Sequence, residues 1–350
     1  MNEFREVIQK VSRGEKLAKD LTREEARQAL LWIFDGQASE FQIGAFFSAM
    51  RMKGESAEET VGLVEAVQER AVRFRPKLEG ALDLGEPYDG KTKTLHLTIP
   101  VALILSSAGI PAVLHSVPET PVKKGVEVER ILQALDVEIV SDPPRLQEIF
   151  EEEKLVYLST EKFVSDFARL RPYREKFGLR PFANHIEKIF NLAHADTQMV
   201  GVYHRPYLEP MGEALVQLGT RRAFIVQGVE GFTEFYLSRK TLALCIEDGR
   251  REILWLDPTR IGFRGEEEEA AGKSPRHHAE RIQQLLKGET GPARNSLLWN
   301  AGVKLFWMKK AAGIEEGLML AREILDSGKA LAKLEAFRNA TQEKAGSKKF

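Results

Sequence analysis

The stretch that decides the fold class is residues 81–115, ALDLGEPYDGKTKTLHLTIPVALILSSAGIPAVLH. An apolar run at 81–85 is followed by a polar loop, an apolar helical segment at 97–109 and a second apolar run at 110–115. Two short buried strands joined through a helix are typical of a parallel sheet, because parallel neighbours need a crossover connection. Thr98 is expected to cap the helix.

Similar strand-like runs recur further along the chain. They lie at 154–159, 199–204, 222–228 and 242–248. Strands that alternate with helices at this spacing predict a mostly parallel sheet. The first 75 residues predict short helices instead, because three Ser or Thr residues each precede a Glu or Gln by three positions, which is the spacing of a capping box. These pairs are Thr22–Glu25, Ser39–Gln42 and Ser56–Glu59.

The sequence therefore predicts an α/β fold, in which a small N-terminal helical domain accompanies a larger α/β domain with a mostly parallel sheet. We expect the helical domain at 1–75, joined by helices from about 163–187, then the α/β domain at 76–340 and a flexible tail at 341–350. The segment 41–52, FQIGAFFSAMRM, is apolar almost all round, so it is expected to be buried in a core or against another subunit.

Composition restricts the function classes. The chain has 350 residues, a formal net charge of −1 and a single cysteine. One cysteine cannot form a disulfide within the chain, so a reducing, cytoplasmic location is expected. The sequence contains no stretch of about 18 consecutive apolar residues, so no membrane span is expected. The near-zero charge gives no general attraction to nucleic acid, so binding of that kind would need a local basic patch.

Several long segments resemble the anthranilate phosphoribosyltransferase family, within the nucleoside phosphorylase type of glycosyltransferase. They are 21–67, 199–234, 285–302 and 323–337. The resemblance covers nearly the whole chain in order. It implies a helical domain beside a larger α/β domain, a substrate site between them, and a homodimer formed through the helical domain.

The loop that binds phosphoribosyl pyrophosphate in this family, Gly-Thr-Gly-Gly-Asp-Gly, is altered here. The equivalent stretch is GEPYDG, of which only Gly85, Asp89 and Gly90 match. Such loops hold phosphates through bare backbone N–H groups. The proline at 87 has no N–H to donate, the tyrosine at 88 adds bulk and the glutamate at 86 adds negative charge. The loop is therefore expected to be unfit for pyrophosphate.

The other family motifs are kept in part. Of the second phosphate loop only His115 remains, with Lys123 and Gly125 matching a later lysine and glycine. The Asp-Glu pair that holds magnesium in the family corresponds to Thr233 and Glu234, and loss of one carboxylate should weaken a Mg²⁺ site. Two residues match family positions that recognise the acidic acceptor. They are Arg174 and Asn184.

These departures resemble a diverged subgroup that is associated with sequence-independent nucleic-acid binding as a homodimer. The matching stretches are 88–90, 115–119 and 184–188. Residues 162–190 also hold seven basic and three acidic side chains, with aromatic residues between them that would form either a stacking surface or a helix core. We therefore predict a catalytically degenerate homodimer, without cofactor, that binds single-stranded or structured nucleic acid. Its predicted contacts are Lys123, Lys124, Arg169, Arg171, Arg174, Lys176, Arg180 and Lys188.

Two alternatives remain open at this point. The first is an active phosphoribosyltransferase that uses phosphoribosyl pyrophosphate, an aromatic or other acidic acceptor, and Mg²⁺ held by Glu234. Its substrate-binding residues would be Gly85, Asp89, Gly90, His115, Lys123, Gly125, Arg174 and Asn184. The second is a module that binds a small anionic metabolite without transforming it.

Overall fold

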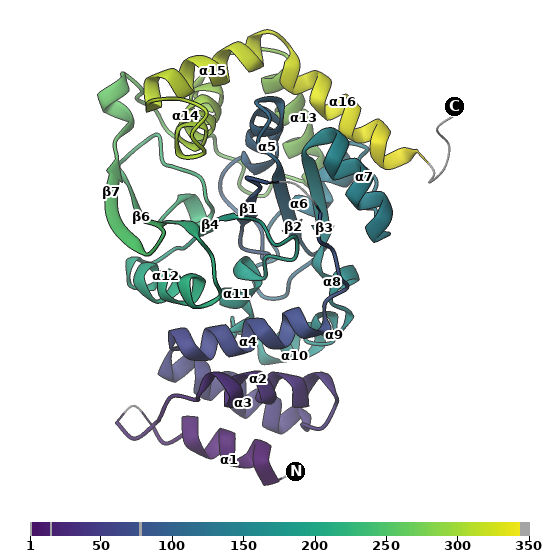
Figure 1. The fold of residues 1–350 in the computed structure, drawn as a ribbon, viewed down its shortest axis with the longest axis vertical. Helices are drawn as coiled ribbons and strands as arrows, with labels where there is room; N and C mark the ends of the chain where they lie inside the picture. Colours follow the sequence, from purple (N-terminus) through teal and green to yellow (C-terminus); the bar gives the residue numbers. More distant parts are fainter. Residues whose placement is uncertain (1, 15, 77–78, 344–350) are drawn as a thin grey trace.

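The computed structural model describes residues 2–14, 16–76 and 79–343. A small helical bundle lies at one end of the molecule, and a sheet covered by helices forms the larger part (Figure 1). The predicted fold class is therefore confirmed. The bundle helices are α1 (Asn2–Val11), α2 (Arg23–Phe34), α3 (Glu40–Lys53) and α4 (Ala57–Arg70).

All three predicted capping boxes are present in the bundle. The side chains of Thr22, Ser39 and Ser56 each accept a hydrogen bond from the backbone N–H three residues on, at the starts of α2, α3 and α4. Helix α3 is buried on one side only. Phe41 is 92% exposed and Met52 is 82% exposed, so the helix presents an apolar face outward, and its predicted burial against another subunit stays a prediction.

The sheet has seven strands in the order β3-β2-β1-β4-β5-β6-β7. Pairing is parallel from β3 to β5 and antiparallel for β6 and β7. The strands are β1 (Leu82–Gly85), β2 (Ala112–Ser116), β3 (Leu155–Ser159), β4 (Thr197–Gly201), β5 (Arg222–Val226), β6 (Thr241–Glu247) and β7 (Arg250–Leu256). Strand β7 escaped prediction because most of its side chains are exposed, so no buried apolar run marks it.

Buried side chains form a core on each face of the sheet, because neighbouring residues of a strand point to opposite faces. On β2, Val113 packs with the core that continues into the helical bundle, whereas Ala112 and Leu114 pack with the core beneath the C-terminal helices. The helices of the α/β domain are α5 (Thr98–Ser107), α6 (Val128–Ala134), α7 (Pro143–Glu153), α12 (Leu208–Gln217), α13 (Pro275–Leu286), α14 (Pro292–Trp307), α15 (Ile314–Asp326) and α16 (Lys329–Gln342).

Short helices after β3 return the chain to the bundle. They are α8 (Thr160–Phe163), α9 (Ser165–Ala168), α10 (Arg171–Phe177) and α11 (Ala183–Ile186). Phe182 packs edge-on against Phe46 and Phe47 of α3, with ring centroids 5.7 and 5.4 Å apart. Phe167 and Phe182 are buried, and Tyr173 and Phe177 pack against the same core. The aromatic residues of this segment are therefore core, not a stacking surface.

Two local predictions need correction. Thr98 is the first residue of α5 and does not cap it, because its hydroxyl donates to the Glu86 carboxylate at 2.9 Å. The predicted tail starts inside α16, where Thr341 is buried and its hydroxyl oxygen accepts a hydrogen bond from the Glu138 backbone N–H. Residues 344–350 of that tail lie outside the described residues. Within the described ranges, no helix combines the length and apolar character needed to cross a membrane.

Candidate active site between the bundle and the sheet

A cavity of about 580 Å³ lies between the helical bundle and the ends of the strands. Its walls come from the loops that follow β1, β2, β4 and β5, together with α3 and the 180–188 segment. Ligands of parallel α/β sheets bind at the carboxyl ends of the strands, and this cavity has that location. Lining residues include Arg51, Asp89, Lys123, Arg180, Asn184, His185, Lys188, Tyr203, His204, Tyr207 and Glu230.

Basic side chains on the cavity wall are balanced by carboxylates. Arg180 forms an ion pair with Asp89 at 2.5 Å. The Lys123 ammonium donates to the Gly90 carbonyl at 2.6 Å and lies 3.5 Å from the Glu230 carboxylate. Lys188 donates to the Gly201 carbonyl at 2.8 Å, and burial lowers its pKa to about 8. An anionic ligand can therefore meet positive charge in this cavity at neutral pH.

The altered loop after β1 turns two of its side chains inward, beneath the cavity. Tyr88 is fully buried, with its hydroxyl 2.6 Å from both His115 Nδ1 and Thr160 Oγ1. Glu86 accepts hydrogen bonds from the backbone N–H and the hydroxyl of Thr233, and burial raises its pKa. The space that a bare glycine loop would leave open is filled by the protein itself.

Gly85 of this loop has a structural role, and so do the neighbouring residues Gly125 and His115. A Cβ added at Gly85 would lie 2.0 Å from the Lys188 carbonyl oxygen, and one added at Gly125 would lie 2.5 Å from the backbone of Gly90. His115 is buried between Tyr88 and Asp83, its Nε2 lying 3.1 Å from the Asp83 carboxylate. Among the alternative substrate residues, Asp89, Lys123 and Asn184 line the cavity.

Arg174, expected to recognise an acceptor carboxylate, does not line the cavity. It is buried and donates to the Glu187 carboxylate at 3.0 Å, and Glu187 in turn accepts from the backbone N–H of Tyr88. Arg174 therefore stabilises the altered loop through Glu187.

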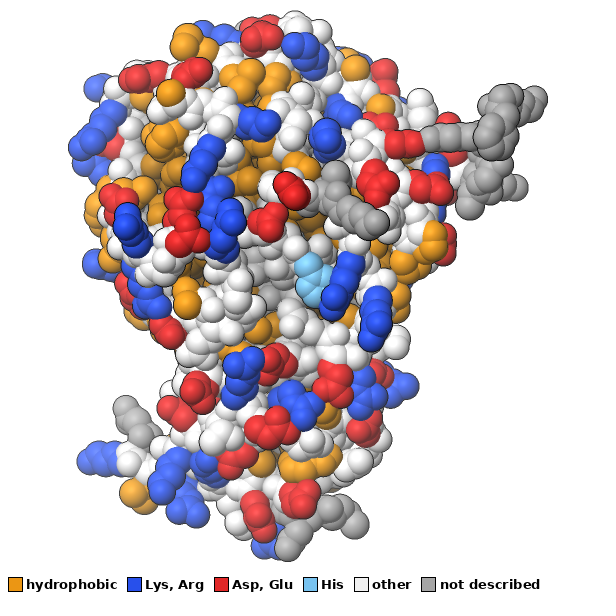
Figure 2. Space-filling model, viewed as in Figure 1, with side chains coloured by type: hydrophobic (Ala, Val, Ile, Leu, Met, Phe, Trp, Pro, Cys, Tyr) orange, Lys and Arg blue, Asp and Glu red, His pale blue; other side chains and the backbone are white. Residues whose placement is uncertain are grey.

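The residues predicted to contact nucleic acid do not form one free basic surface. Arg169 pairs with Asp166 and Arg171 with Glu161, while Lys176 pairs with Glu40. Arg174, Arg180 and Lys188 are held as described above, and Lys124 is exposed just after a turn at 121–123. On the face seen in Figure 2, basic and acidic side chains are interspersed over both parts of the molecule.

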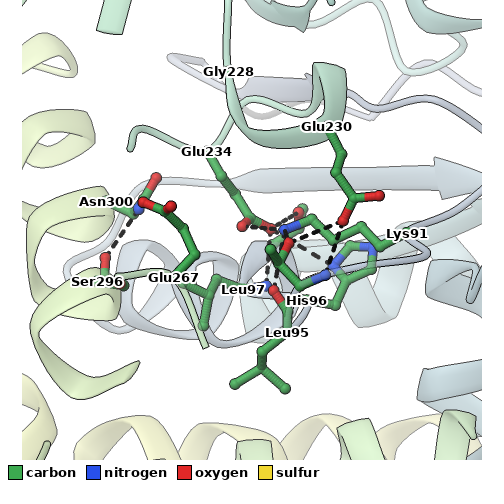
Figure 3. A network of polar contacts seen from close by, with 12 residues as sticks. Lys91, Leu95, His96, Leu97, Gly228, Glu230, Glu234, Glu267, Ser296 and Asn300 are labelled. Atoms are coloured by element: carbon green, nitrogen blue, oxygen red, sulfur yellow. Dashed lines mark hydrogen bonds and ion pairs between the residues drawn. The ribbon is translucent and has the colours of Figure 1, made fainter. Parts of the chain in front are cut away.

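Glu234, the metal ligand under the phosphoribosyltransferase alternative, is already paired with a buried ammonium. Its carboxylate accepts from Lys91 Nζ and from the Leu97 backbone N–H at 2.9 Å (Figure 3). Lys91 is 1% exposed and also donates to Thr94 Oγ1 at 3.1 Å and to the Leu95 carbonyl at 3.0 Å. The lysine thus fills the position beside Glu234 that a cation would take.

This arrangement does not fit a Mg²⁺ ion held by Glu234. The partner carboxylate of the family is a threonine here, and its hydroxyl is engaged by Glu86. Within residues 2–14, 16–76 and 79–343, no three histidine, cysteine, aspartate or glutamate side chains are grouped as a metal would need. No step is therefore assigned to a metal at this position.

Sequence reasoning missed several cavity residues. Tyr203 and His204 follow β4, so the rule that ligands bind at the carboxyl ends of strands could have identified them. Arg51 and His185 come from helices of the bundle and its neighbouring segment, and only the tertiary packing brings them to the cavity. Glu230 lies in the short helical turn η3 (Val229–Gly231), for which no sequence signal was recognised.

Comparison with known proteins identifies the fold and the family. A model described as the helical bundle domain of a glycosyl transferase family matches residues 5–71, and the a/b domain of the same family matches 89–331. The chain is similar to anthranilate phosphoribosyltransferase from Methanobrevibacter smithii, with 31% identity over 95% of this chain and 98% of that protein. It is 33% identical to the enzyme of that name from Methanocorpusculum labreanum, over 90% and 93% of the two chains.

Solved structures agree with this assignment. Anthranilate phosphoribosyltransferase from Thermus thermophilus superimposes with a TM-score of 0.84 at 27% identity, covering 98% of this chain and 100% of that chain. The Saccharomyces cerevisiae protein of that name, solved in complex with PRPP and Mg, gives a TM-score of 0.84 at 18% identity, over 97% and 98% of the two chains. The second likeness shows the fold alone.

These findings overturn the predicted nucleic-acid-binding function. Relatives that match over nine-tenths of the chain or more are named as phosphoribosyltransferases. The error has a physical cause: the excess of basic residues at 162–190 was counted along the sequence, whereas their carboxylate partners, such as Glu40, Asp89 and Glu161, lie mostly outside that segment. The expectations of a non-catalytic chain and of no cofactor, which followed from that prediction, have no support either.

Proposed function

The chain belongs to the anthranilate phosphoribosyltransferase family of glycosyl transferases, and from this premise we propose that it transfers a phosphoribosyl group in the cavity between the bundle and the sheet. One observation carries the proposal: Lys123, Arg180 and Lys188 converge on a cavity at the carboxyl ends of the parallel strands. Such a cavity suits a donor with several phosphate charges and an uncharged sugar between them.

In the proposed reaction, the acceptor forms a bond to the anomeric carbon of the ribose while the bond from that carbon to the diphosphate breaks. Negative charge increases on the diphosphate as it leaves, so fixed positive groups close to it lower the barrier. Arg180 is oriented for this by Asp89, and Lys123 by the Gly90 carbonyl. Both cations are therefore positioned before the ligand arrives.

Aromatic side chains of the cavity wall favour an aromatic acceptor. Tyr203 is 58% exposed and Tyr207 is 39% exposed, and both line the cavity near Met211. The His185 ring lies against Tyr207 with centroids 4.8 Å apart, and its Nδ1 is 2.9 Å from the Glu55 carboxylate. Flat rings pack well on such a wall, and the neighbouring cations would attract an acidic group on the acceptor.

The test is a direct assay for pyrophosphate release from phosphoribosyl pyrophosphate with anthranilate and a panel of other aromatic acids, in buffer that contains Mg²⁺. We expect turnover with at least one acceptor, and Arg180→Ala should lower kcat/KM by about 10²-fold. Arg276→Ala is the control, because this exposed arginine of α13 pairs with Glu280 and does not line the cavity. The absence of turnover with every acceptor would contradict the proposal.

We also propose that the chain forms a homodimer through the outward face of α3. Phe41 and Met52 expose large apolar side chains at the two ends of this helix, a pattern that suits burial against a second copy. Sedimentation analysis should show a dimer, and Phe41→Glu with Met52→Glu should yield monomers. A monomeric wild type would refute this.

A further inference from the structure

Three successive backbone N–H groups converge on the carboxylate of Glu230. Those of Thr92, Lys93 and Thr94 donate to it at 2.9, 3.1 and 2.9 Å. The hydroxyls of Thr92 and Thr94 donate at 3.1 and 3.0 Å, and Lys123 Nζ is 3.5 Å away. The carboxylate thus accepts five hydrogen bonds and faces an ammonium, although it comes from a loop far along the chain.

The same donor set is typical of a phosphate site. Consecutive N–H groups of one turn form a concave anion site, and hydroxyls and a lysine beside it are common partners of phosphate oxygens. Nothing in these donors is specific for a carboxylate. Burial alone would raise the pKa of Glu230, but the N–H groups of Thr92 and Thr94 and the charges of Lys123 and Lys91 lower it to about 2. The turn therefore stabilises an anion strongly.

The site opens on the cavity. Its present occupant, the Glu230 carboxylate, comes from a different loop of the cavity wall than the turn at 92–94. Thr92, Lys93, Thr94, Lys123 and Glu230 all line the cavity. Glu230 and Glu234 both reach from the loop after Gly228 toward segment 91–97 (Figure 3). The two acids differ in exposure to the cavity, because Glu234 lies with Lys91 behind it, whereas Glu230 is part of its surface.

The backbone at Glu230 is in an unfavourable conformation. Its φ is 53° and its ψ is 18°, in the left-handed region that side chains other than glycine rarely adopt. Such a conformation costs of order 1 kcal/mol or more and persists because surrounding contacts hold it. Here the carboxylate contacts act together with backbone hydrogen bonds of the turn, such as that from the Gly231 N–H to the Gly228 carbonyl at 3.0 Å. Releasing the carboxylate would remove one of these two sets of contacts.

We propose that the turn Thr92–Thr94 is a binding site for a phosphate group of the ligand, and that Glu230 occupies it in the free protein and is displaced when the phosphate binds. The inference rests on the proposed function for its choice of a phosphate ester as the natural ligand. It goes beyond that function in placing the phosphate away from the altered 85–90 loop and in giving Glu230 the role of an internal competitor. Ligand entry then also frees Lys123 from its carboxylate partner.

The test is a calorimetric titration of the full chain with inorganic pyrophosphate, in the absence of acceptor. Glu230→Gly removes the competing anion and suits the left-handed backbone, so we expect binding about 10-fold tighter than in the wild type or better. Glu267→Gln is the matched control. Glu267 also lines the cavity and accepts from the backbone N–H groups of Leu237 and Ser238, so this variant reports the general effect of removing one negative charge.

Each outcome decides the inference. An equal gain in both variants, or no gain in Glu230→Gly, overturns it. If Glu230→Gly does not fold, Glu230→Gln keeps the size of the side chain while removing its charge, and it should still bind pyrophosphate more tightly than the Glu267→Gln control does. Thr92→Val with Thr94→Val, added to whichever Glu230 variant folds, should reduce the gain, because the two hydroxyls are lost while the three backbone N–H groups remain. Tighter pyrophosphate binding in the Glu230 variant without any phosphoribosyl transfer supports the site and refutes the proposed function. Phosphoribosyl transfer without tighter binding in the variant supports the proposed function and refutes the site.

Discussion

The layer beneath the cavity and the cavity wall contain the same kinds of charged group but hold them differently. Beneath the cavity, Lys91 and Glu234 are almost completely buried and satisfy each other. On the wall, Arg180 is 45% exposed in its side chain and pairs with Asp89. A ligand can replace a partner of the second kind, but it cannot reach the first without opening the core.

The comparison suggests how a family site can change while its fold stays constant. Glu86, Tyr88 and Lys91 fill the deep part with side chains that bond to Thr233, His115 and Glu234. The shallow part holds cations together with Glu230 as an internal anion. We therefore expect the ligand of this chain to bind in the shallow part of the site.

The largest expected effect is on the buried pair. Lys91→Met leaves the Glu234 carboxylate buried without its cation, and breaking such a pair from one side costs about 3–5 kcal/mol of unfolding free energy. Urea denaturation of wild type and variant measures the difference.

Two further variants serve as controls for the loss of stability in Lys91→Met. Lys91→Met combined with Glu234→Gln removes both charges and should regain most of the lost stability. Arg180→Ala breaks a pair in which only the arginine is exposed. Because Asp89 lines the cavity, water can solvate its carboxylate, so the loss of stability should be smaller than for Lys91→Met. If Lys91→Met were no more harmful than Arg180→Ala, the distinction between the two layers would be wrong.

An intermediate effect is expected on pH dependence. Lys188 lines the cavity, and burial lowers its pKa to about 8, so the side chain is charged below that pH and neutral above it. Donor binding should therefore weaken as the pH rises, by about 10-fold between pH 7 and pH 9. Titrations with pyrophosphate across this range measure the decline.

The Lys188→Gln variant supplies the control. It lacks the titrating group, so its affinity should be lower at pH 7, and the pH dependence that remains up to pH 9 reports the ionisation of pyrophosphate itself. A wild-type profile with the same pH dependence as this variant would show that Lys188 does not contact the anion.

The fold could be predicted from sequence because its signals are local. The buried runs of β1 to β6 and the capping boxes of α2 to α4 can be identified within windows of a few residues. Strand β7 could not, since Ile253 and Trp255 remain about half exposed and the strand is fixed by pairing with β6.

The site was harder to predict, because it depends on partners that are distant in sequence. Sequence indicated that the 85–90 loop departs from its family, and that Asp89, Lys123 and Asn184 belong near a ligand. It gave no sign that Glu230 would reach the turn at 92–94, which lies far earlier in the chain. It also counted Arg171 and Lys176 as free charges, whereas Glu161 and Glu40 neutralise them.

The smallest expected effect is on metal binding, and it tests whether Glu234 in the buried layer binds the ion. Mn²⁺ binding, followed by electron paramagnetic resonance in the presence of pyrophosphate, reports any ion that enters with the phosphates. Lys91 already fills the place beside Glu234, so Glu234→Gln should change the Mn²⁺ affinity by about twofold or less. Loss of a true ligand costs well over about 10-fold.

Asp89→Asn, on the cavity wall, is the comparison variant, since its carboxylate is within reach of the ligand. A loss of Mn²⁺ binding in Glu234→Gln that exceeds the loss in Asp89→Asn would mean that Lys91 moves aside for the ion. The layer beneath the cavity would then be part of the working site after all.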